Sequence, residues 1–191
     1  MPRPLSFDPI EKLSEATDCF WASSYAEASI SQLTEALKIN KFSLYKQFGD
    51  KEQLYSLSLE YYNEHFYQPL LSPLRSLEGK ASVLGYLDNF GTYIGGKTGQ
   101  HGCFINNTLL AGPTLPESCR RDALAMAMDL RQLLLDNFNI AKEQNDLQLS
   151  PIDCVNFSTM TIQALLNIRR TMGAKAMKKN LSFFQDMIKS W

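Results

Sequence analysis

Histidine and cysteine are scarce in this sequence. Its 191 residues include two histidines and four cysteines, and the cysteines, at positions 19, 103, 119 and 154, form no C-x-x-C pair. A structural zinc site needs clustered Cys and His ligands, so we expect no metal site. A disulfide-stapled secreted domain is a poor match to this length and apolar content. The sequence contains no Ser/His/Asp arrangement and no carboxylate pair at apolar positions that would indicate a catalytic site. We also expect no cofactor.

Long apolar runs and a strong net charge are also missing. No stretch of about 20 apolar residues occurs, so we expect no membrane span, and the opening MPRPLSFDPI lacks the apolar segment of a signal peptide. The formal net charge of −1 excludes a polybasic, histone-like nucleic-acid binder but allows a local basic patch. With 45% hydrophobic and 20% charged residues, the chain can build a packed core. We expect a cytoplasmic protein of one domain or two small ones.

Apolar residues recur at spacings of three and four along most of the chain, which is the pattern of amphipathic helices. Capping residues predict helix starts at Asp8, Ser29, Asn40, Asp50 and Ser150. Further stripes predict helices over 81–94, about 117–142, about 151–172 and from 177 to the end. Because no sustained alternation or hairpin pattern occurs, the predicted fold class is all-α.

The region 29–51 carries the pattern of a helix-turn-helix. Caps at positions 29, 40 and 50 define two short helices in succession, and the second helix of such a motif can enter the DNA major groove. In that helix, Leu44 and Phe48 are spaced to face inward. The side chains then left for bases or phosphates are Lys41, Ser43, Tyr45, Lys46 and Gln47. Residues 1–66 carry a net charge of −4, whereas the window 38–51 carries +3, so positive charge is concentrated on the proposed DNA-reading segment.

A longer set of residues strengthens this interpretation. The set comprises Cys19-Phe20-Trp21, Tyr25, Ser29-Ile30, Leu33, Ser43-Leu44-Tyr45, Phe48-Gly49-Asp50-Lys51-Glu52 and Leu54. Over roughly residues 8–62 it resembles the N-terminal pattern of TetR/AcrR-family transcriptional regulators. The chain departs from that pattern at Ser24 and Lys38, where the family usually has glycine.

The resemblance implies an N-terminal three-helix helix-turn-helix DNA-binding domain and a C-terminal helical domain that dimerises and binds an effector. We place the first domain at 1–50, extending into a linking helix over 51–68, and the second at 69–191. By position, Ser29, Tyr45 and Lys51 would contact phosphates. The residues that would face the groove are Lys41, Phe42, Ser43, Lys46 and Gln47. The implied function is a homodimeric regulator, expected to be a repressor that a small molecule releases from a palindromic operator.

An enzyme is the alternative from a different class. Residues Gly91 to Thr98 satisfy the G-x-x-x-x-G-K-T pattern of a phosphate-binding loop, which would suit an all-α nucleotide-binding or small-molecule enzyme. That chemistry needs a buried strand before the loop and a helix directly after it. Because the preceding residues have helical spacing, we interpret the segment as a glycine-rich turn between helices.

The C-terminal part offers candidates for an effector pocket. Residues 102–108 partly resemble a Gly-Cys-aliphatic-aliphatic-Asn-Thr stretch of one TetR subgroup. The pocket candidates are Tyr62, Phe66, Tyr86, Phe90, Cys103, Phe104 and Asn107. A mostly apolar cavity with a few polar groups would suit a small lipophilic or aromatic effector. Two alternatives stay open: these aromatics are simply core, and Cys103 is either a sensor thiol or a small buried hydrophobe.

The dimer interface is expected on the helices over about 117–142 and 151–172, paired with their copies as an isologous four-helix bundle. The residues expected near it are Leu134, Ile162, Leu166 and Arg169. The second of these helices is apolar on more than one face, so we expect it to be buried on most sides. The alternative is that both helices belong to the core of a monomer.

Overall fold

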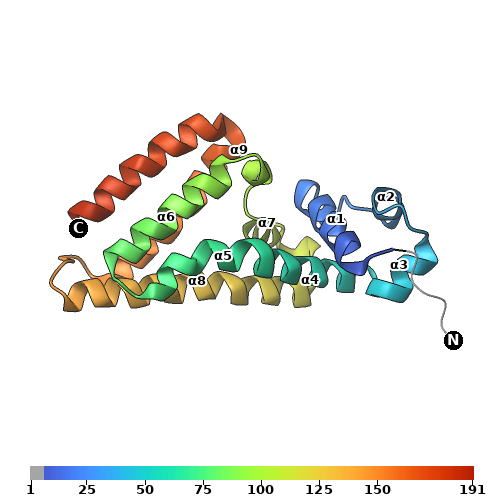
Figure 1. Cartoon of the computed structure of the whole chain (residues 1–191), viewed down its shortest axis with the longest axis horizontal. Coiled ribbons are helices and arrows are strands. Elements are labelled where there is room, and N and C mark those ends of the chain that lie inside the picture. The colour runs from blue at the N-terminus through green and yellow to red at the C-terminus, as the bar shows by residue number, and fades with distance from the viewer. Residues whose placement is uncertain (1–6) are drawn as a thin grey trace.

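The computed structural model describes residues 7–191, apart from the side chain of Thr98. The first six residues of the predicted 1–50 domain, Arg3 among them, lie outside the described part. Within the described part the chain is helical and contains no strand, as the predicted fold class required. Figure 1 shows a small N-terminal group of helices beside a larger C-terminal group, joined by a long helical path that belongs to both.

Four helices build the N-terminal group: α1 (Pro9–Ala22), α2 (Ile30–Ala36), α3 (Lys41–Phe48) and α4 (Lys51–Tyr62). Each begins where the sequence places a capping residue. The side chains of Asp8, Ser29, Asn40 and Asp50 all accept a backbone hydrogen bond from the first turn. At Ser29 and Asp50 a glutamine three residues later completes a capping box. Because side chains satisfy these exposed N–H groups, the short helices start at fixed points.

Helix α1 packs along α4, and the apolar faces of α2 and α3 close the core between them. Phe20, Leu33, Leu44 and Leu54 are almost completely buried there. Ile10, in the first turn of α1, is 66% exposed, because the buried residues of α1 begin at Ala16.

The helical path continues beyond α4 without an open loop. It passes through a π-helical turn η1 (Asn63–Tyr67), the short α5 (Gln68–Leu71) and a 3-10 turn η2 (Ser72–Ser76). The N–H of Gln68 bonds to the carbonyl of Asn63, five residues back, directly before Pro69. Proline has no N–H to donate, so this wider turn lets the path continue across it. The predicted boundary at 68/69 therefore lies within a bent helix.

Three long helices dominate the C-terminal group: α6 (Lys80–Gly95), α8 (Glu117–Glu143) and α9 (Pro151–Ser190). Between α6 and α8 the chain forms η3 (Thr98–His101), α7 (Phe104–Leu110) and η4 (Gly112–Thr114). Helix α9 is broken at Gly173, whose φ of 86° and ψ of 176° are not helical. This matches the two predicted helices, one ending near 172 and one starting near 177. Figure 1 shows the last part of α9 returning alongside α6.

The second apolar face of α9 is a correction to the sequence analysis. Phe157, Met160, Ala164 and Met172 are exposed, and Met160 reaches 66%. Only Ile168 of that face is half-buried. Helices α6 and α8 cover one side of α9, and on the opposite side Phe157 contacts Phe184 and Trp191 while remaining partly exposed.

The described residues also bear on two other classes of site. None of their helices combines the length and apolarity that crossing a bilayer would need. They contain no group of three or more His, Cys, Asp or Glu side chains placed to bind a metal ion.

Candidate functional sites

Helix α3 divides its side chains between the core and the solvent. Leu44 and Phe48 are buried, whereas Lys41, Phe42, Tyr45 and Lys46 are exposed on the outer surface. Phe42 is 75% exposed, which is unusual for a phenylalanine on a short helix with its own core face. Ser43 and Gln47 are half-buried at the edges of the same surface. All six predicted α3 contacts therefore lie on one accessible helix side, at the end of the molecule away from the C-terminal group (Figure 1).

The two remaining predicted contact residues lie at neighbouring helix starts. The Ser29 hydroxyl caps α2 by accepting from the Gln32 N–H at 3.2 Å, which leaves its own proton free to donate. Lys51 begins α4, and its Nζ lies 4.3 Å from the centre of the Tyr25 ring. Partial burial lowers the pKa of Lys51 from its usual range. The cation–π contact holds this ammonium beside α3 rather than leaving it free in solvent.

The turn between α2 and α3 ends in a left-handed residue that is not glycine. Lys38 has a φ of 53°. Its N–H bonds to the carbonyl of Glu35 at 3.2 Å, and the Ile39 N–H bonds to that of Thr34 at 3.2 Å. This pair of bonds is the Schellman arrangement, in which glycine usually occupies the position of Lys38. The turn therefore forms with a lysine at the cost of backbone strain.

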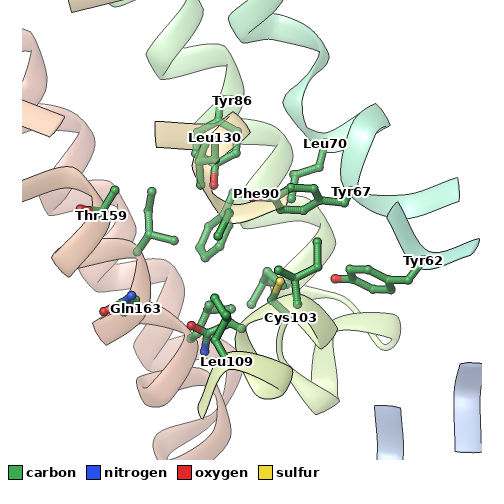
Figure 2. Close-up of a pocket in the computed structure, with 16 residues that line it drawn as sticks. Tyr62, Tyr67, Leu70, Tyr86, Phe90, Cys103, Leu109, Leu130, Thr159 and Gln163 are labelled. Atoms are coloured by element: carbon green, nitrogen blue, oxygen red, sulfur yellow. The ribbon is translucent and has the colours of Figure 1, made fainter. Parts of the chain in front are cut away.

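A second feature is a cavity of about 110 Å³ within the C-terminal group. Figure 2 shows Tyr86 and Phe90 of α6 between Tyr62, Tyr67 and Leu70 on one side and Thr159 and Gln163 of α9 on the other. Of the predicted pocket residues, the cavity brings together Tyr62, Tyr86, Phe90 and Cys103. The side chains that the sequence analysis did not select include Tyr67, Leu70, Leu109, Leu130, Thr159 and Gln163. No local pattern marks them, because five different elements bring them together.

The cavity wall is apolar but carries neutral hydrogen-bonding groups. Burial raises the pKa of Tyr62, Tyr67 and Tyr86 well above the usual phenol range, so their hydroxyls stay protonated. Burial also raises the pKa of the Cys103 thiol, and hydrogen bonds from Tyr62 and from the amides of Ile105 and Asn106 only partly offset this. Because a reactive cysteine needs a depressed pKa, these surroundings hold Cys103 as a neutral thiol at neutral pH.

The other three predicted pocket residues lie elsewhere. Phe66 packs on Trp21 and Tyr93, with ring centres 6.1 Å away in each case, and does not line the cavity. Phe104 points toward Tyr55 and Tyr62, and Asn107 donates to the carbonyl of His101 at 2.8 Å. Helical spacing predicted that these residues are inward-facing, but spacing alone cannot separate core contacts from a cavity wall.

The four residues predicted at a dimer interface are engaged inside the chain, which corrects that prediction. Leu134, Ile162 and Leu166 are buried, and the last two line the cavity. Arg169 donates to the carbonyls of Ile94 and Gly96 at 2.8 and 3.1 Å. Ile162, Leu166 and Arg169 face α6 and the cavity because α9 turns its first apolar stripe inward.

The glycine motif lies at the wrong end of a helix for a phosphate-binding loop. Gly91 to Gly95 form the last part of α6, so carbonyl oxygens and the negative end of the helix dipole are exposed there. Arg169 binds two of these carbonyls. A phosphate needs the opposite, a helix N-terminus preceded by a strand, and the described residues contain no strand. The expected turn between helices is confined to residues 96 and 97, because residues 91–95 belong to α6.

Comparison with known proteins relates both the N-terminal sequence and the complete fold to one group. Residues 13–56 match the family model for bacterial regulatory proteins of the tetR family. A comparison with curated protein sequences gave no significant match.

Solved structures of similar fold cover nearly the entire chain. A TetR-family transcriptional regulator from Cytophaga hutchinsonii has a TM-score of 0.79 at 16% identity, covering 95% of this chain and 93% of its own. The reduced form of NemR from E. coli has a TM-score of 0.75 at 18% identity, with 94% and 97% covered. A cysteine mutant of the TetR-family regulator CifR, complexed with 26-bp double-strand operator DNA, has a TM-score of 0.71 at 24% identity, with 99% and 100% covered. At these identities the likenesses concern the fold.

Proposed function

We propose that this chain is a member of the tetR family of bacterial regulatory proteins and acts as a homodimeric repressor that a small molecule releases from a palindromic operator. The observation that carries DNA binding is the outer surface of α3. There, the exposed side chains of Lys41, Phe42, Tyr45 and Lys46 project away from the buried anchors Leu44 and Phe48.

The distribution of charge supports this surface over other faces of the N-terminal group. The window 38–51 carries a net charge of +3 within a region, 1–66, of net charge −4. Phosphate contacts supply most of the affinity for DNA, so four lysines around α3 orient that helix toward the duplex. The aromatic side chain of Phe42, together with the polar side chains of Lys46 and Gln47, is then available to the base edges.

The test separates phosphate contacts from base contacts. Operator sequences are first selected from random DNA with the full-length protein, and affinities are then measured over a range of salt concentrations. Lys51→Ala should weaken binding to all sequences and reduce the slope of log K against log salt by about one phosphate contact. Lys46→Ala and Gln47→Ala should change the preference between sites.

Lys179→Ala, which removes an exposed lysine from α9, is the matched control and should leave both properties unchanged. Equal affinity of the wild type and a Lys41, Tyr45, Lys51 triple-alanine variant for every DNA tested would refute the proposed surface.

The homodimer is proposed from the uncovered apolar side chains of α8 and α9. Leu124 and Met128 of α8 and Phe157, Met160 and Ala164 of α9 are exposed along two packed helices. Exposed apolar patches on a soluble chain mark interaction surfaces. Pairing this surface with its own copy would place two α3 helices on one duplex, as recognition of a palindrome requires.

The effector is proposed to occupy the apolar cavity beside Tyr86 and Phe90. A cavity of about 110 Å³ suits a compact apolar molecule near the size of benzene, which fits a cavity of roughly 150 Å³ in another protein. Tyr62, the last residue of α4, lines the cavity, while the first residue of α4 is Lys51. A ligand that displaces Tyr62 would therefore act on the helix that positions α3, and would favour a domain arrangement that binds DNA less well.

A further inference from the structure

A second and larger hollow lies between the two groups of helices. Its volume is about 440 Å³, within the range of small-molecule sites. It is lined by the end of α1, by Tyr55 of α4, by η3 and α7, and by Arg170 of α9. We call it the interdomain cleft. It is distinct from the apolar cavity, with which it shares no lining residue.

Aromatic rings form much of the wall of the interdomain cleft. Trp21 and Tyr25 come from the N-terminal group, Tyr55 from the joining helix and Phe104 from α7. Tyr55 meets both Tyr25 and Phe104 edge to face, with ring centres 5.2 and 5.3 Å apart. Trp21, Tyr55 and Phe104 are almost completely buried, so the apolar surface open to a ligand comes from the exposed Leu110 and the half-buried Tyr25.

One cation in the lining has no anionic partner. Arg170 is exposed, and within residues 7–191 no carboxylate forms an ion pair with it. Its hydrogen bond is to the Asn107 amide oxygen at a long 3.4 Å. A guanidinium presents a fork of N–H donors that matches a carboxylate, so Arg170 can bind an anion at little cost to its present contacts.

Other polar groups of the lining agree with an acceptor-rich ligand. The Trp21 Nε1 is buried and has no hydrogen-bond partner among the described residues, although Trp21 itself lines the cleft. His101 and Gln100 of the lining hydrogen-bond to each other, and burial raises the pKa of the nearby Asp18 carboxyl, an effect that His101 only partly offsets. Arg170 is the guanidinium of the lining and is therefore the group available to a ligand anion.

We propose that the interdomain cleft is a second ligand site and that it binds small aromatic carboxylates, with the carboxylate on Arg170 and the ring against the apolar surface of Leu110 and Tyr25. Its ligand contacts α1 and α4 together with α7 and α9. Binding therefore favours one arrangement of the two groups of helices over others.

Two tryptophans make the test direct. Trp21 lines the cleft, whereas Trp191 packs at the other end of the molecule against Phe138, Phe157 and Phe184. In the full-length Trp191→Phe variant, Trp21 is the remaining tryptophan, so its fluorescence reports on the cleft. We expect trans-cinnamate to change this fluorescence saturably, and cinnamamide, which lacks the charge, to bind at least ~10-fold more weakly. Hexanoate, which lacks the ring, should also bind more weakly.

Further substitutions in the Trp191→Phe variant test whether cinnamate binds in the interdomain cleft. Arg170→Gln should weaken cinnamate binding ~10-fold and abolish the preference over cinnamamide, because the charged hydrogen bonds are lost. Ala111→Leu, which narrows the cleft, should weaken both compounds. The matched control Lys179→Gln removes an exposed cation of the same helix and should change neither.

Three results would overturn the proposal: no saturable binding of cinnamate, equal binding of hexanoate, or cinnamate binding that survives Arg170→Gln and Ala111→Leu but is lost in Leu130→Phe. The last result would place the ligand in the apolar cavity. These binding measurements contain no DNA. A failure of cinnamate to bind the cleft is therefore distinguishable from a failure of the proposed DNA-binding function.

Discussion

Lys38 holds a backbone conformation that a β-carbon makes unfavourable, at the turn that orients α3. A left-handed conformation costs an L-residue on the order of 1 kcal/mol, and glycine avoids most of this cost. The hydrogen bonds of the turn are all formed, so the strain is confined to one residue. The lysine also adds one of the four positive charges between positions 38 and 51. At position 38, glycine would favour stability, whereas lysine supplies positive charge to the proposed DNA-binding surface.

Lys38→Gly should raise the free energy of unfolding by about 1 kcal/mol, because φ at position 38 becomes unstrained. The same change should weaken DNA binding through the loss of a charge. Lys38→Ala is the matched control: it removes the same charge but keeps the strain. Urea denaturation and DNA affinity together separate the two effects. A Lys38→Gly variant no more stable than Lys38→Ala would contradict the assignment of strain.

At the scale of the elements, hydrogen bonds between residues close in sequence account for most helix starts. They account for few of the places where a helix bends or breaks. Caps at Asp8, Ser29, Asn40 and Asp50 depend on neighbours three residues away, so the sequence alone predicted them. The continuation past Pro69 depends on the π-helical turn before it and on packing against α6 and α8, and local patterns do not reveal it. The break in α9 was visible as a gap between two apolar stripes, although the direction of the second half was not.

Gly173 is the residue that permits the break in α9. Its φ of 86° and ψ of 176° fall in a region open almost only to glycine, while no atom lies within 4 Å of where a β-carbon would be. Gly173→Ala should therefore lower the free energy of unfolding by about 1–3 kcal/mol through backbone strain rather than a clash. Thr171→Ala, an exposed change on the same helix, is the control for urea denaturation. Equal stability of the two variants would show that α9 tolerates another path.

At the scale of the whole molecule, the sequence predicted which residues are apolar but not how they are divided among core, cavity and free surface. Ile162 and Leu166 were predicted to meet a second copy, yet they line the cavity, while Met160 of the same helix is exposed. Helical spacing separates two faces of α9 but cannot say which one α6 and α8 cover. The same limit explains why Phe66 lies outside the cavity and Tyr67, one residue later, lines it.

Because Ile162 and Leu166 are buried inside the chain, the proposed homodimer is better tested at an exposed residue of α9. Met160→Glu should convert the proposed dimer to a monomer, because it places a charge in the exposed apolar surface of α9. Asn167→Glu, also exposed on α9, is the matched control. Light scattering at micromolar concentration without DNA gives the mass, and circular dichroism checks that both variants fold. A wild-type mass of one chain would refute the homodimer.

Buried tyrosines predict how the stability of the whole molecule depends on pH. Burial raises the pKa of Tyr55 to about 12 and moves the pKa values of Tyr62, Tyr67 and Tyr86 in the same direction. Above pH ~10 the unfolded chain loses these protons while the folded chain keeps them. The free energy of unfolding should thus be insensitive to these groups up to pH ~9 and fall above pH ~10.

Urea denaturation across pH 7–11.5 measures this fall, and absorbance at 295 nm follows the phenolates. The slope should reach about 1.4 kcal/mol per pH unit for each tyrosine that ionises only in the unfolded chain. Tyr86→Phe should reduce it by one such contribution. Phenolate appearing well before unfolding would show that the hydroxyls are accessible.

The return of α9 along α6 also determines the order in which the molecule can assemble. Contacts among α1, α2, α3 and α4 connect residues from the first third of the chain, so the N-terminal group can fold while later residues are still being synthesised. Helix α6, in contrast, packs on η2, α5 and α8 but is completely covered only when the residues after Gly173 dock on it, Leu181 against Gly91 among them. The nascent chain thus acquires its proposed DNA-reading surface before it completes the walls of its proposed effector cavity.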